Sequence, residues 1–379
     1  MRVSLLSVLV FVITKLPVTA TAVVDGTHEA DGDLGWGPYW LLNQTQDKSA
    51  HFYLEGINQN AGLGHAFMSF NHLVTLAHQN NVTPHFTFQA EAHGLKATSV
   101  KSYFFGDLFK SPLPTDRHCT RIESSPETIE HQISDARNKS VSCAIFIIKN
   151  PAPSEVGVNT NLPLYRQLFN RNEGMRKFVK RKERRIDRNI VTVSVHIRRG
   201  DLFKYVGNDR KKAELRIVAV SAYTSVLKQL SSKLIQLGKN RMHVCLFCEG
   251  MREPASIQDV NGTFVNLKRE LSLENVTFSA GDTDALQAFD DMCASDILIT
   301  GTSGFSHLAS ILCRTPIILA MPFWHSYDYI PNAMNLQIGK GKYTLPNTAN
   351  KTPFTFTNSA RFNDSQFDLL WQTLNEDHI

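Results

Sequence analysis

Short apolar runs alternate with polar and glycine-rich segments along most of the chain, and the spacing of apolar residues switches between strand-like and helical periods. Over residues 51–88 this pattern predicts a strand at 51–55, a glycine-rich loop at 56–64, an amphipathic helix at 66–79 and a second strand at 83–88. Residues 95–145 show little periodicity, and one more strand is expected at 144–148. A strand, a loop, a helix and a strand in this order indicate an α/β unit.

From residue 190 onward the alternation of strands and helices becomes regular. The pattern predicts strands at 191–197, 242–247, 276–279, 297–300 and 317–320, and helices at 218–237, 284–294 and 305–312. A parallel, doubly wound sheet is the simplest arrangement of such a series.

Length and composition fit two domains. The chain has 379 residues, of which 42% are hydrophobic and 20% are charged, so it can bury two cores of ordinary size. We place an N-terminal α/β domain at 51–185 and a second α/β domain at 186–345. A C-terminal segment with a final helix follows at 346–379.

The first residues have the pattern of a secretory signal peptide. An apolar run at 3–13 follows Arg2 and leads into Ala20-Thr21-Ala22, which has the small-x-small form of a cleavage site. The run is shorter than an ordinary membrane span, and a marginal Golgi anchor is the alternative. We expect a signal peptide at 1–22, a stem at 23–50 and no later span, which predicts a protein of the Golgi or endoplasmic reticulum lumen, or a secreted one.

Seven N-x-S/T sequons agree with this compartment, and they predict glycosylation on the surface. Their asparagines are Asn43, Asn81, Asn138, Asn261, Asn275, Asn350 and Asn363.

Among the six cysteines we favour a pair between Cys119 and Cys143. Cys245 and Cys248 have the spacing of a redox pair, but positions i and i+3 of a strand face opposite sides, which favours core packing.

The formal net charge of +5 is unevenly distributed. Residues 171–188 contain nine Lys or Arg and three acids, on a segment with helical character. A solvated helix is the default interpretation, and an anionic partner such as a sulfated glycan is the alternative. Nucleic acid is not expected in a secreted chain that carries sequons. The segment has a single aromatic residue, Phe178, and so lacks the interleaved aromatic residues that base stacking requires.

The strand expected at 191–197 ends in the most informative motif of the chain. Arg198, Arg199 and Asp201 come directly after His196 and Ile197, where the buried strand ends. Ligands of open α/β sheets collect at this end of the strands, and the guanidinium group fits phosphate oxygens. An ordinary surface pair of arginines is the alternative. An adhesion function for the Arg-Gly-Asp tripeptide fits poorly, because a buried strand leads into it.

Two other segments suit an anion. The loop with Gly62 and Gly64 opens a helix, where backbone N–H groups and the helix dipole favour negative charge. A later strand leads into a turn with Thr302 and Ser303 that opens another helix, an arrangement in which hydroxyls and amides hold phosphate. Ordinary helix capping explains either hydroxyl equally well.

Together these motifs resemble the GDP-fucose-dependent fucosyltransferases, the superfamily of the alpha-1,2, alpha-1,6 and protein O-fucosyltransferases. The H-x-R-R-x-D motif is similar to the family's donor-site motif, and Thr302, Ser303, Phe305 and Ser306 occupy positions of its third motif. The glycine-rich loop is similar to the first motif, with His65 where alpha-1,2 members usually carry Asn. Glu55, followed by Gly56 and Asn58, looks like the start of the protein O-fucosyltransferase loop that carries a catalytic carboxylate.

The resemblance implies a GT-B-like fold, with two Rossmann-type α/β domains facing a cleft. The domain at 51–185 would lie on the acceptor side, and the domain at 186–345 would bind the nucleotide sugar. The implied reaction is inverting transfer of fucose from GDP-fucose to a glycan or glycoprotein acceptor, without a metal ion or other cofactor. Arg198 and Arg199 would neutralise the leaving diphosphate, oriented by Asp201, and His196 would contact guanine. By the same resemblance Glu55 would be the base, and Asp284, Asp290 or Asp291 would read guanine. Glu249 is placed by the strand pattern instead: it follows the strand expected at 242–247 and would border the same crevice as Arg198. The alternatives are another nucleotide sugar, or a secreted glycan-binding protein without catalysis.

Overall fold

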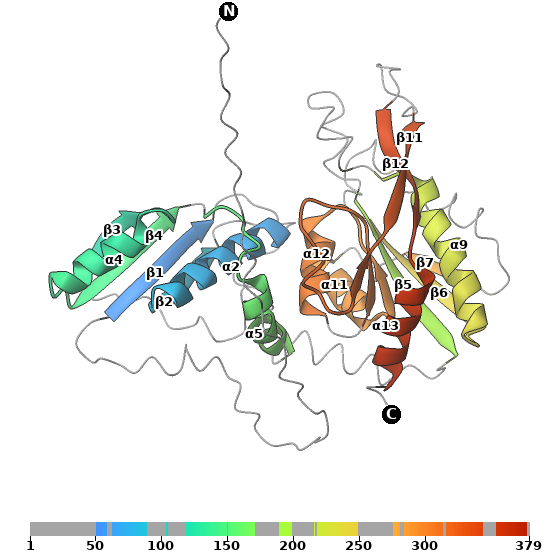
Figure 1. Cartoon of the computed structure of the whole chain (residues 1–379), viewed down its shortest axis with the longest axis horizontal. Coiled ribbons are helices and arrows are strands. Elements are labelled where there is room, and N and C mark those ends of the chain that lie inside the picture. The colour runs from blue at the N-terminus through green and yellow to red at the C-terminus, as the bar shows by residue number, and fades with distance from the viewer. Residues whose placement is uncertain are drawn as a thin grey trace, which may run out of the picture. The chain divides into compact units, whose positions relative to one another are not determined.

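The computed structural model describes residues 51–58, 63–88, 104, 119–149, 151–170, 189–198, 216, 218–248, 276–280, 284–313, 316–343 and 354–376. All of these residues belong to one structural unit, Pro38–Ile379. Their strands form a four-stranded sheet, a six-stranded sheet and a separate two-stranded pair (Figure 1). The two larger sheets are parallel throughout, which confirms the predicted GT-B-like α/β fold with two Rossmann-type sheets.

The first sheet has the strand order β2-β1-β4-β3. Its strands are β1 (His51–Asn58), β2 (Thr83–Phe88), β3 (Thr120–Ser124) and β4 (Cys143–Lys149). The helices of this part of the chain are α2 (Leu63–Gln79), α4 (Ile129–Asn138) and α5 (Val158–Asn170). The inner strands β1 and β4 supply the apolar core of the sheet, with Leu54 and Phe146 fully buried.

The bounds predicted for the loop, 56–64, are wrong at both ends. Residues 56–58 continue β1, because they pair with residues 86–88 of β2. Glycine weakens a strand interior, yet pairing on both sides keeps β1 regular through Gly56. At the other end Leu63 already begins α2, so Gly64 lies in the first turn of the helix. Residues 59–62, which include the predicted site residue Gly62, lie outside the described part of the chain.

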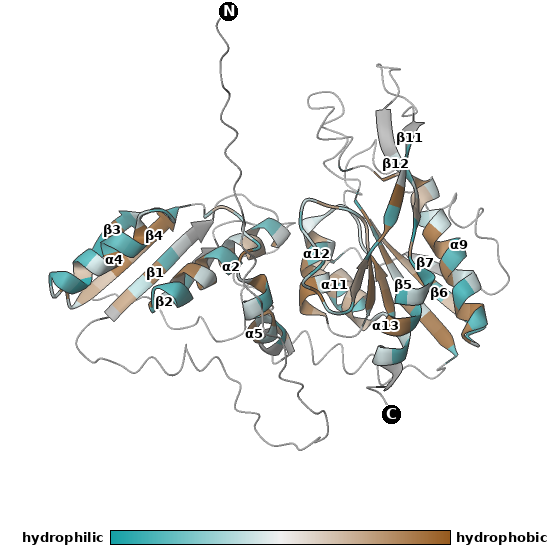
Figure 2. Cartoon of the chain, viewed as in Figure 1, coloured by the Kyte–Doolittle hydropathy of each residue, from teal (hydrophilic) through white to brown (hydrophobic). Residues whose placement is uncertain are grey.

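The second sheet has the strand order β10-β9-β8-β5-β6-β7. Its strands are β5 (Ile190–Ile197), β6 (Arg241–Cys248), β7 (Val276–Ala280), β8 (Ile297–Ile299), β9 (Ile317–Ala320) and β10 (Ala333–Asn335). Helices α9 (Val220–Gln236), α11 (Ala285–Ala294) and α12 (Gly304–Leu312) alternate with them. The central strands are apolar in Figure 2 and buried on both faces, which is typical of a parallel sheet covered by helices.

The strand order of this sheet reverses between β5 and β8. From β5 the chain adds β6 and β7 on one side, whereas β8, β9 and β10 are added on the other side. Connections that leave two neighbouring strands in opposite directions open a crevice at their carboxyl ends, where open α/β sheets bind ligands. Arg198 follows β5 at this edge, and residues 300–303 follow β8.

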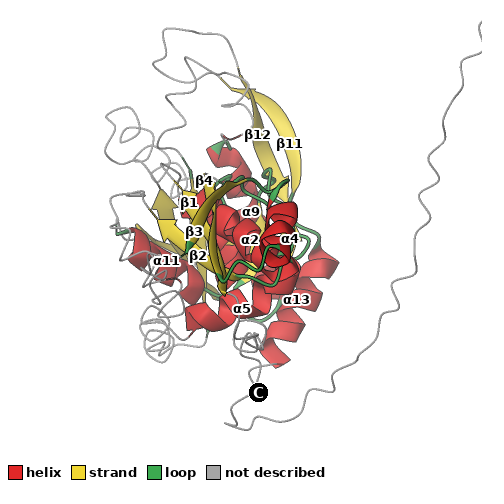
Figure 3. Ribbon diagram, turned by 90° about the vertical axis from the view of Figure 1, so that its left-hand side faces the viewer, coloured by secondary structure: helices red, strands yellow, loops and turns green. Residues whose placement is uncertain are grey.

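An antiparallel pair completes the fold. It consists of β11 (Gln337–Tyr343) and β12 (Phe354–Arg361), two long curved strands in Figure 3, and it is followed by helix α13 (Asp364–Glu376). β12 lies against α9, where Ala219 N donates to the Thr357 carbonyl at 2.8 Å. The buried ring of Phe367 anchors α13 in the core that α9 shares with one face of the second sheet.

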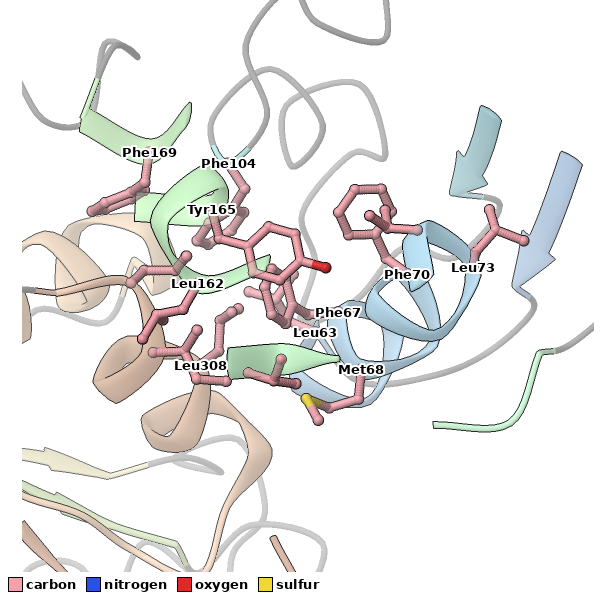
Figure 4. Close-up of a cluster of buried hydrophobic side chains, with 14 of the residues drawn as sticks. Leu63, Phe67, Met68, Phe70, Leu73, Phe104, Leu162, Tyr165, Phe169 and Leu308 are labelled. Atoms are coloured by element: carbon pink, nitrogen blue, oxygen red, sulfur yellow. The ribbon is translucent and has the colours of Figure 1, made fainter. Parts of the chain in front are cut away.

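Helices α2, α5 and α12 share one hydrophobic cluster, which Figure 4 shows in close-up. The ring of Phe67 in α2 meets the ring of Tyr165 in α5 edge-on, with their centroids 5.0 Å apart, and Leu308 of α12 is buried in the same cluster. The Tyr165 hydroxyl donates to Asn71 Oδ1 at 2.8 Å, so its burial leaves no polar group unsatisfied. This packing holds the start of α2 beside the start of α12.

Two disulfide bonds link neighbouring elements. The bond between Cys119 and Cys143 confirms the predicted pair, and a second bond between Cys293 and Cys313 joins the ends of α11 and α12. Cys245 and Cys248 are both thiols, as core packing on a strand predicts. Burial raises the pKa of the Cys245 thiol, which disfavours the reactive thiolate.

The predicted surface features are described only in part. Three of the sequon asparagines, Asn81, Asn138 and Asn363, are exposed, and the other four lie outside the described residues, as does the basic segment 171–188. Within the described ranges, no helix combines the length and the apolar character that a membrane crossing requires.

Candidate functional site

Arg198 and Ser303 meet at the edge where the strand order reverses. Arg198 directly follows β5, and Ser303 ends the turn between β8 and α12. The guanidinium Nη1 lies 3.4 Å from Ser303 Oγ, within donating distance. Ser303 is fully buried and is also the N-cap of α12, accepting a hydrogen bond from Phe305 N at 3.2 Å. A cation, a hydroxyl and a helix N-terminus therefore converge at the switch point, which is a set of groups that suits a phosphate.

Glycine is required at position 301 by the close packing of this turn against the end of β5. A Cβ atom there would lie 2.6 Å from the carbonyl oxygen of His196 and 3.3 Å from the backbone nitrogen of Arg198. Real Cβ atoms do not approach a carbonyl oxygen this closely, so any side chain would push the turn away from the strand. Gly301 thus sets the distance at which Ser303 meets Arg198.

The other hydroxyls of the turn hold its backbone. Ser306 Oγ accepts from Gly301 N at 3.2 Å and lies 3.2 Å from the Gly301 carbonyl oxygen, while Thr302 Oγ1 donates to the carbonyl of Arg216. Both side chains are buried. Ser303, which the family resemblance also singles out, differs in that its side chain contacts the arginine after β5.

Aromatic rings pack beneath this contact. The rings of His196 and Phe305 have their centroids 5.7 Å apart, and Phe289 of α11 packs edge-on against Phe305 at the same distance. His196 is 1% exposed and Phe305 is 7% exposed, so these rings support the site from below. The role of His196 in contacting guanine stays a prediction.

Two helix N-termini meet beside the Arg198 side chain. Gly64 in the first turn of α2 lies against Gly304, the first residue of α12, and a Cβ on Gly304 would lie 3.5 Å from the backbone nitrogen of His65. The positive ends of both helix dipoles therefore face the same region. His65 is exposed here, and partial desolvation lowers the pKa of its imidazole.

Arg216 and Trp324 belong to the same region and were not predicted from the sequence. The Arg216 guanidinium carbon lies 4.0 Å from the centre of the Trp324 ring, and the Arg216 carbonyl accepts the Thr302 hydroxyl. Trp324 is 55% exposed and follows the carboxyl end of β9. The rule that pointed to Arg198 and Ser303, namely chemistry at the carboxyl ends of parallel strands, also applies to the residues after β9.

The predicted carboxylates have different environments. Glu55 is 6% exposed, and its Oε2 forms an ion pair with Arg121 Nη2 at 2.7 Å, across the first sheet from β3. Asp284 is exposed and caps α11 by accepting from Gln287 N at 2.9 Å, which is the ordinary structural use of such a residue. Asp290 is buried within α11.

The remaining predicted site residues, Arg199, Asp201 and Glu249, lie outside the described part of the chain. Among the residues that the structure describes, no group of three or more His, Cys, Asp or Glu side chains is arranged to hold a metal ion.

Comparisons with known proteins add distant likenesses in fold. No family model and no curated protein matches the sequence. Among solved structures, POFUT1 in complex with GDP matches at 12% identity and a TM-score of 0.40, over 74% of this chain and 99% of that chain. NodZ alpha-1,6-fucosyltransferase soaked with GDP-fucose matches at 12% identity and a TM-score of 0.34, over 72% of this chain and 95% of that chain.

E. coli ADP-heptose LPS heptosyltransferase II matches at 9% identity and a TM-score of 0.35, over 86% of this chain and 99% of that chain. The last two structures are glycosyltransferases by name, and they use different sugars. At these identities and TM-scores the likeness concerns the fold alone.

Proposed function

We propose that this chain is an inverting, metal-independent glycosyltransferase that transfers fucose from GDP-fucose to a glycan or glycoprotein acceptor. The observation that carries the proposal is the contact between Arg198 and Ser303 at the switch point of the second sheet, 3.4 Å from Nη1 to Oγ. A guanidinium group, a hydroxyl and the N-terminus of α12 are aimed at one place, and this place is where α/β sheets bind nucleotides.

The chemistry of transfer needs these groups because the sugar leaves behind a diphosphate. As the bond from the sugar to the phosphate oxygen breaks, negative charge develops on GDP. A fixed guanidinium aimed at that charge contributes about 3–4 kcal/mol, or about 10²–10³ in rate. In our proposal Arg198 supplies this charge together with Arg199, Ser303 donates its hydroxyl, and the starts of α2 and α12 add their dipoles.

The identities of the nucleotide and the sugar rest on the motif resemblance in the sequence. His196, Asp290 and Phe305 are the proposed guanine side of the site, because they lie next to the turn after β8 or in the helix α11 that packs against α12. The acceptor is a glycan or glycoprotein, and the compartment is the secretory lumen, in keeping with the sequons and the N-terminal segment.

Titration calorimetry and thermal unfolding with nucleotides test the proposal directly. We expect GDP and GDP-fucose to bind in a metal-free buffer, and a ligand at 100 times its Kd to add about 2.7 kcal/mol of stability. ADP, UDP and their sugar conjugates are the comparison ligands. Preference for one of them would mean that the donor is a different nucleotide sugar. A protein that binds no nucleotide would not be a transferase of this kind.

Arg198→Ala and Arg241→Ala form a matched pair for the same measurement. Arg198 follows the carboxyl end of β5. The exposed Arg241 begins the neighbouring strand β6, so it lies where the strands have their amino ends. We expect the first variant to lose GDP affinity and the second to keep it. Equal GDP affinities in the two variants would mean that the switch point does not take part in donor binding.

A further inference from the structure

A histidine and a glutamate form a hydrogen-bonded pair near the candidate donor site. His325 Nδ1 lies 2.8 Å from Glu155 Oε1, and the same oxygen accepts from Ser326 N at 2.9 Å. His325 comes from the segment after β9, while Glu155 comes from the connection before α5. The side chains are 10% and 31% exposed, respectively, so the pair is mostly shielded from water.

The carboxylate fixes which ring nitrogen of His325 carries the proton. A carboxylate only accepts hydrogen bonds, so Nδ1 must be the donor, and neutral His325 then has its lone pair on Nε2. Nε2 has no hydrogen bond to the described residues and is not among their fully buried polar atoms that lack a partner, so it is not fully buried. A basic nitrogen is therefore left accessible, in the tautomer that a carboxylate enforces on a general base.

Ionisable groups from four parts of the structure lie around the pair. Besides Glu155, the groups next to His325 are His65 of α2 and His307 of α12. Tyr327 and Tyr329 of its own segment interact with Glu155, and their rings pack against His307. The His307 ring stacks on the His325 ring at 4.8 Å. Burial lowers the pKa of His325 below its ordinary value of 6.5, Glu155 opposes this shift, and His65 adds to it. His325 is thus uncharged at neutral pH, which is the form that accepts a proton.

A short series of contacts leads from this pair to Arg198. The His325 ring is next to Trp324, with their centroids 6.0 Å apart, and Trp324 covers Arg216. The Arg216 carbonyl accepts the hydroxyl of Thr302, whose neighbour Ser303 contacts Arg198. His307, which stacks on His325, lies one helical turn after Ser303, because its backbone nitrogen donates to the Ser303 carbonyl. The base and the proposed diphosphate site therefore lie on neighbouring strand ends, β9 and β8.

We infer that His325 is the general base that accepts the proton of the acceptor hydroxyl, with Glu155 as the residue that positions it. This inference rests on the proposed function. The acceptor oxygen forms a bond to C1 of the donor sugar, the bond from C1 to the phosphate oxygen breaks, and its electron pair leaves with the nucleoside diphosphate. The hydroxyl proton moves to His325 Nε2, the imidazolium is stabilised by Glu155, and the proton passes to water after the product leaves.

This assignment differs from the base that the motif resemblance indicates. Glu55 has one oxygen in an ion pair with Arg121, and no described contact connects it to the turn after β8. Glu155 and His325 come from the two halves of the chain that also supply α2 and α12. A purely structural alternative is that the pair joins the connection before α5 to the segment after β9.

Steady-state kinetics of four variants distinguishes a general base from a residue that only links two segments. We expect His325→Ala to lower kcat by about 10²–10⁴-fold while the Kd of GDP stays unchanged, and added imidazole to restore part of the loss. Glu155→Gln keeps an oxygen at the same position and removes the charge. We expect a lower kcat and an acid limb of the pH-rate profile that moves to lower pH, because the carboxylate no longer raises the pKa of His325.

The matched control is His243→Ala, since His243 is a partly buried histidine that hydrogen-bonds to Thr277 and Ser279 near the amino end of β6. We expect this variant to keep wild-type kcat. A His325→Ala variant with normal kcat, or a Glu155→Gln variant whose pH-rate profile is that of the wild type, would overturn the inference. Loss of turnover in Glu55→Gln alone would return the role to Glu55. These outcomes leave GDP binding intact, whereas failure of the proposed function would appear as a wild-type protein that binds no nucleotide.

Discussion

Gly64 of α2 and Gly304 of α12 are in direct backbone contact. A Cβ atom on Gly64 would lie 2.0 Å from the carbonyl oxygen of Gly304, and a Cβ on Gly304 would lie 3.2 Å from Gly64 Cα. Gly64 therefore has no room for a side chain, whereas Gly304 is merely tight. Since Gly304 follows Ser303 directly, this contact also sets how the first half of the chain approaches the turn that meets Arg198.

Alanine at these two glycines should have unequal effects. Overpacking of a close contact costs about 1–3 kcal/mol, and we expect Gly64→Ala to reach the upper end of that range because the obstructing atoms belong to the backbone. Gly304→Ala needs a shift of only a few tenths of an ångström and should cost about 1 kcal/mol or less. Urea unfolding of both variants measures the difference. Equal stabilities would mean that the two helices are not in contact.

The sequence predicted the buried parallel strands well because their signal is local. The strands at β2 and β9 have the predicted bounds, and β5 and β6 are longer by one or two residues. Helix α4 was missed although Ile129, Ile133 and Ala136 recur at helical spacing, because charged neighbours dilute the pattern. Helix α5 was missed because Pro163 lies inside it, a position that ordinarily ends a helix.

The candidate site was predicted where it follows a strand and missed where it depends on tertiary contacts. Arg198 comes directly after a buried strand, and Ser303 ends the short turn that follows another, so the sequence pattern indicated both positions. Their contact follows from the order of β5 and β8 in the sheet, which the sequence does not state. The pairing of Glu155 with His325 joins residues that are 170 positions apart, and no local sequence pattern predicts such a pair.

Lysine at position 198 should keep the positive charge and lose the planar fork. We expect Arg198→Lys to lower turnover by about 10²–10³-fold, because an ammonium group cannot bind two phosphate oxygens in the geometry of a guanidinium. The melting temperature should stay near that of the wild type. Donor turnover is the measurement, with the exposed Arg241→Lys as the control. Wild-type turnover in Arg198→Lys would contradict the proposed role of Arg198 in binding the leaving diphosphate.

Alanine at position 303 should weaken both the helix cap and the donor site. Loss of the cap costs about 1 kcal/mol of stability, and loss of a hydrogen bond to phosphate should weaken GDP binding by about 0.5–3 kcal/mol. Ser310→Ala is the control, because this buried serine of α12 hydrogen-bonds to the His307 carbonyl, away from Arg198. Calorimetric titration of GDP decides the matter. An unchanged Kd beside a lower melting temperature would reduce Ser303 to a cap.

Chelation should leave activity intact. The proposed site neutralises the diphosphate with Arg198, the Ser303 hydroxyl and helix dipoles, so none of its groups needs Mn²⁺ or Mg²⁺. Turnover of GDP-fucose in excess EDTA is the measurement, with the same protein in Mn²⁺ as the comparison. Loss of activity in EDTA that Mn²⁺ restores would assign the protein to a different class of transferase.

Acid should destabilise the fold through His307. Burial, followed by the charge of His325, lowers the pKa of His307 to about 3, with a hydrogen bond to the Ser326 carbonyl acting in the opposite direction. An unfolded histidine titrates near 6.5, so between these two values the unfolded state binds a proton that the folded state does not. Stability is then fully present above the unfolded value and is lost as the pH falls toward the folded one.

The expected slope is about 1.4 kcal/mol per pH unit. His307→Gln can still hydrogen-bond to the Tyr329 hydroxyl, which lies 2.8 Å from His307 Nε2, but has no proton to gain. We therefore expect its free energy of unfolding to fall less steeply between neutral pH and about pH 4. The difference in slope should correspond to about one proton fewer taken up on unfolding. Urea titrations across this range measure both slopes, with His131→Gln on the exposed face of α4 as the control. Parallel curves for wild type and His307→Gln would show that the acid sensitivity arises elsewhere.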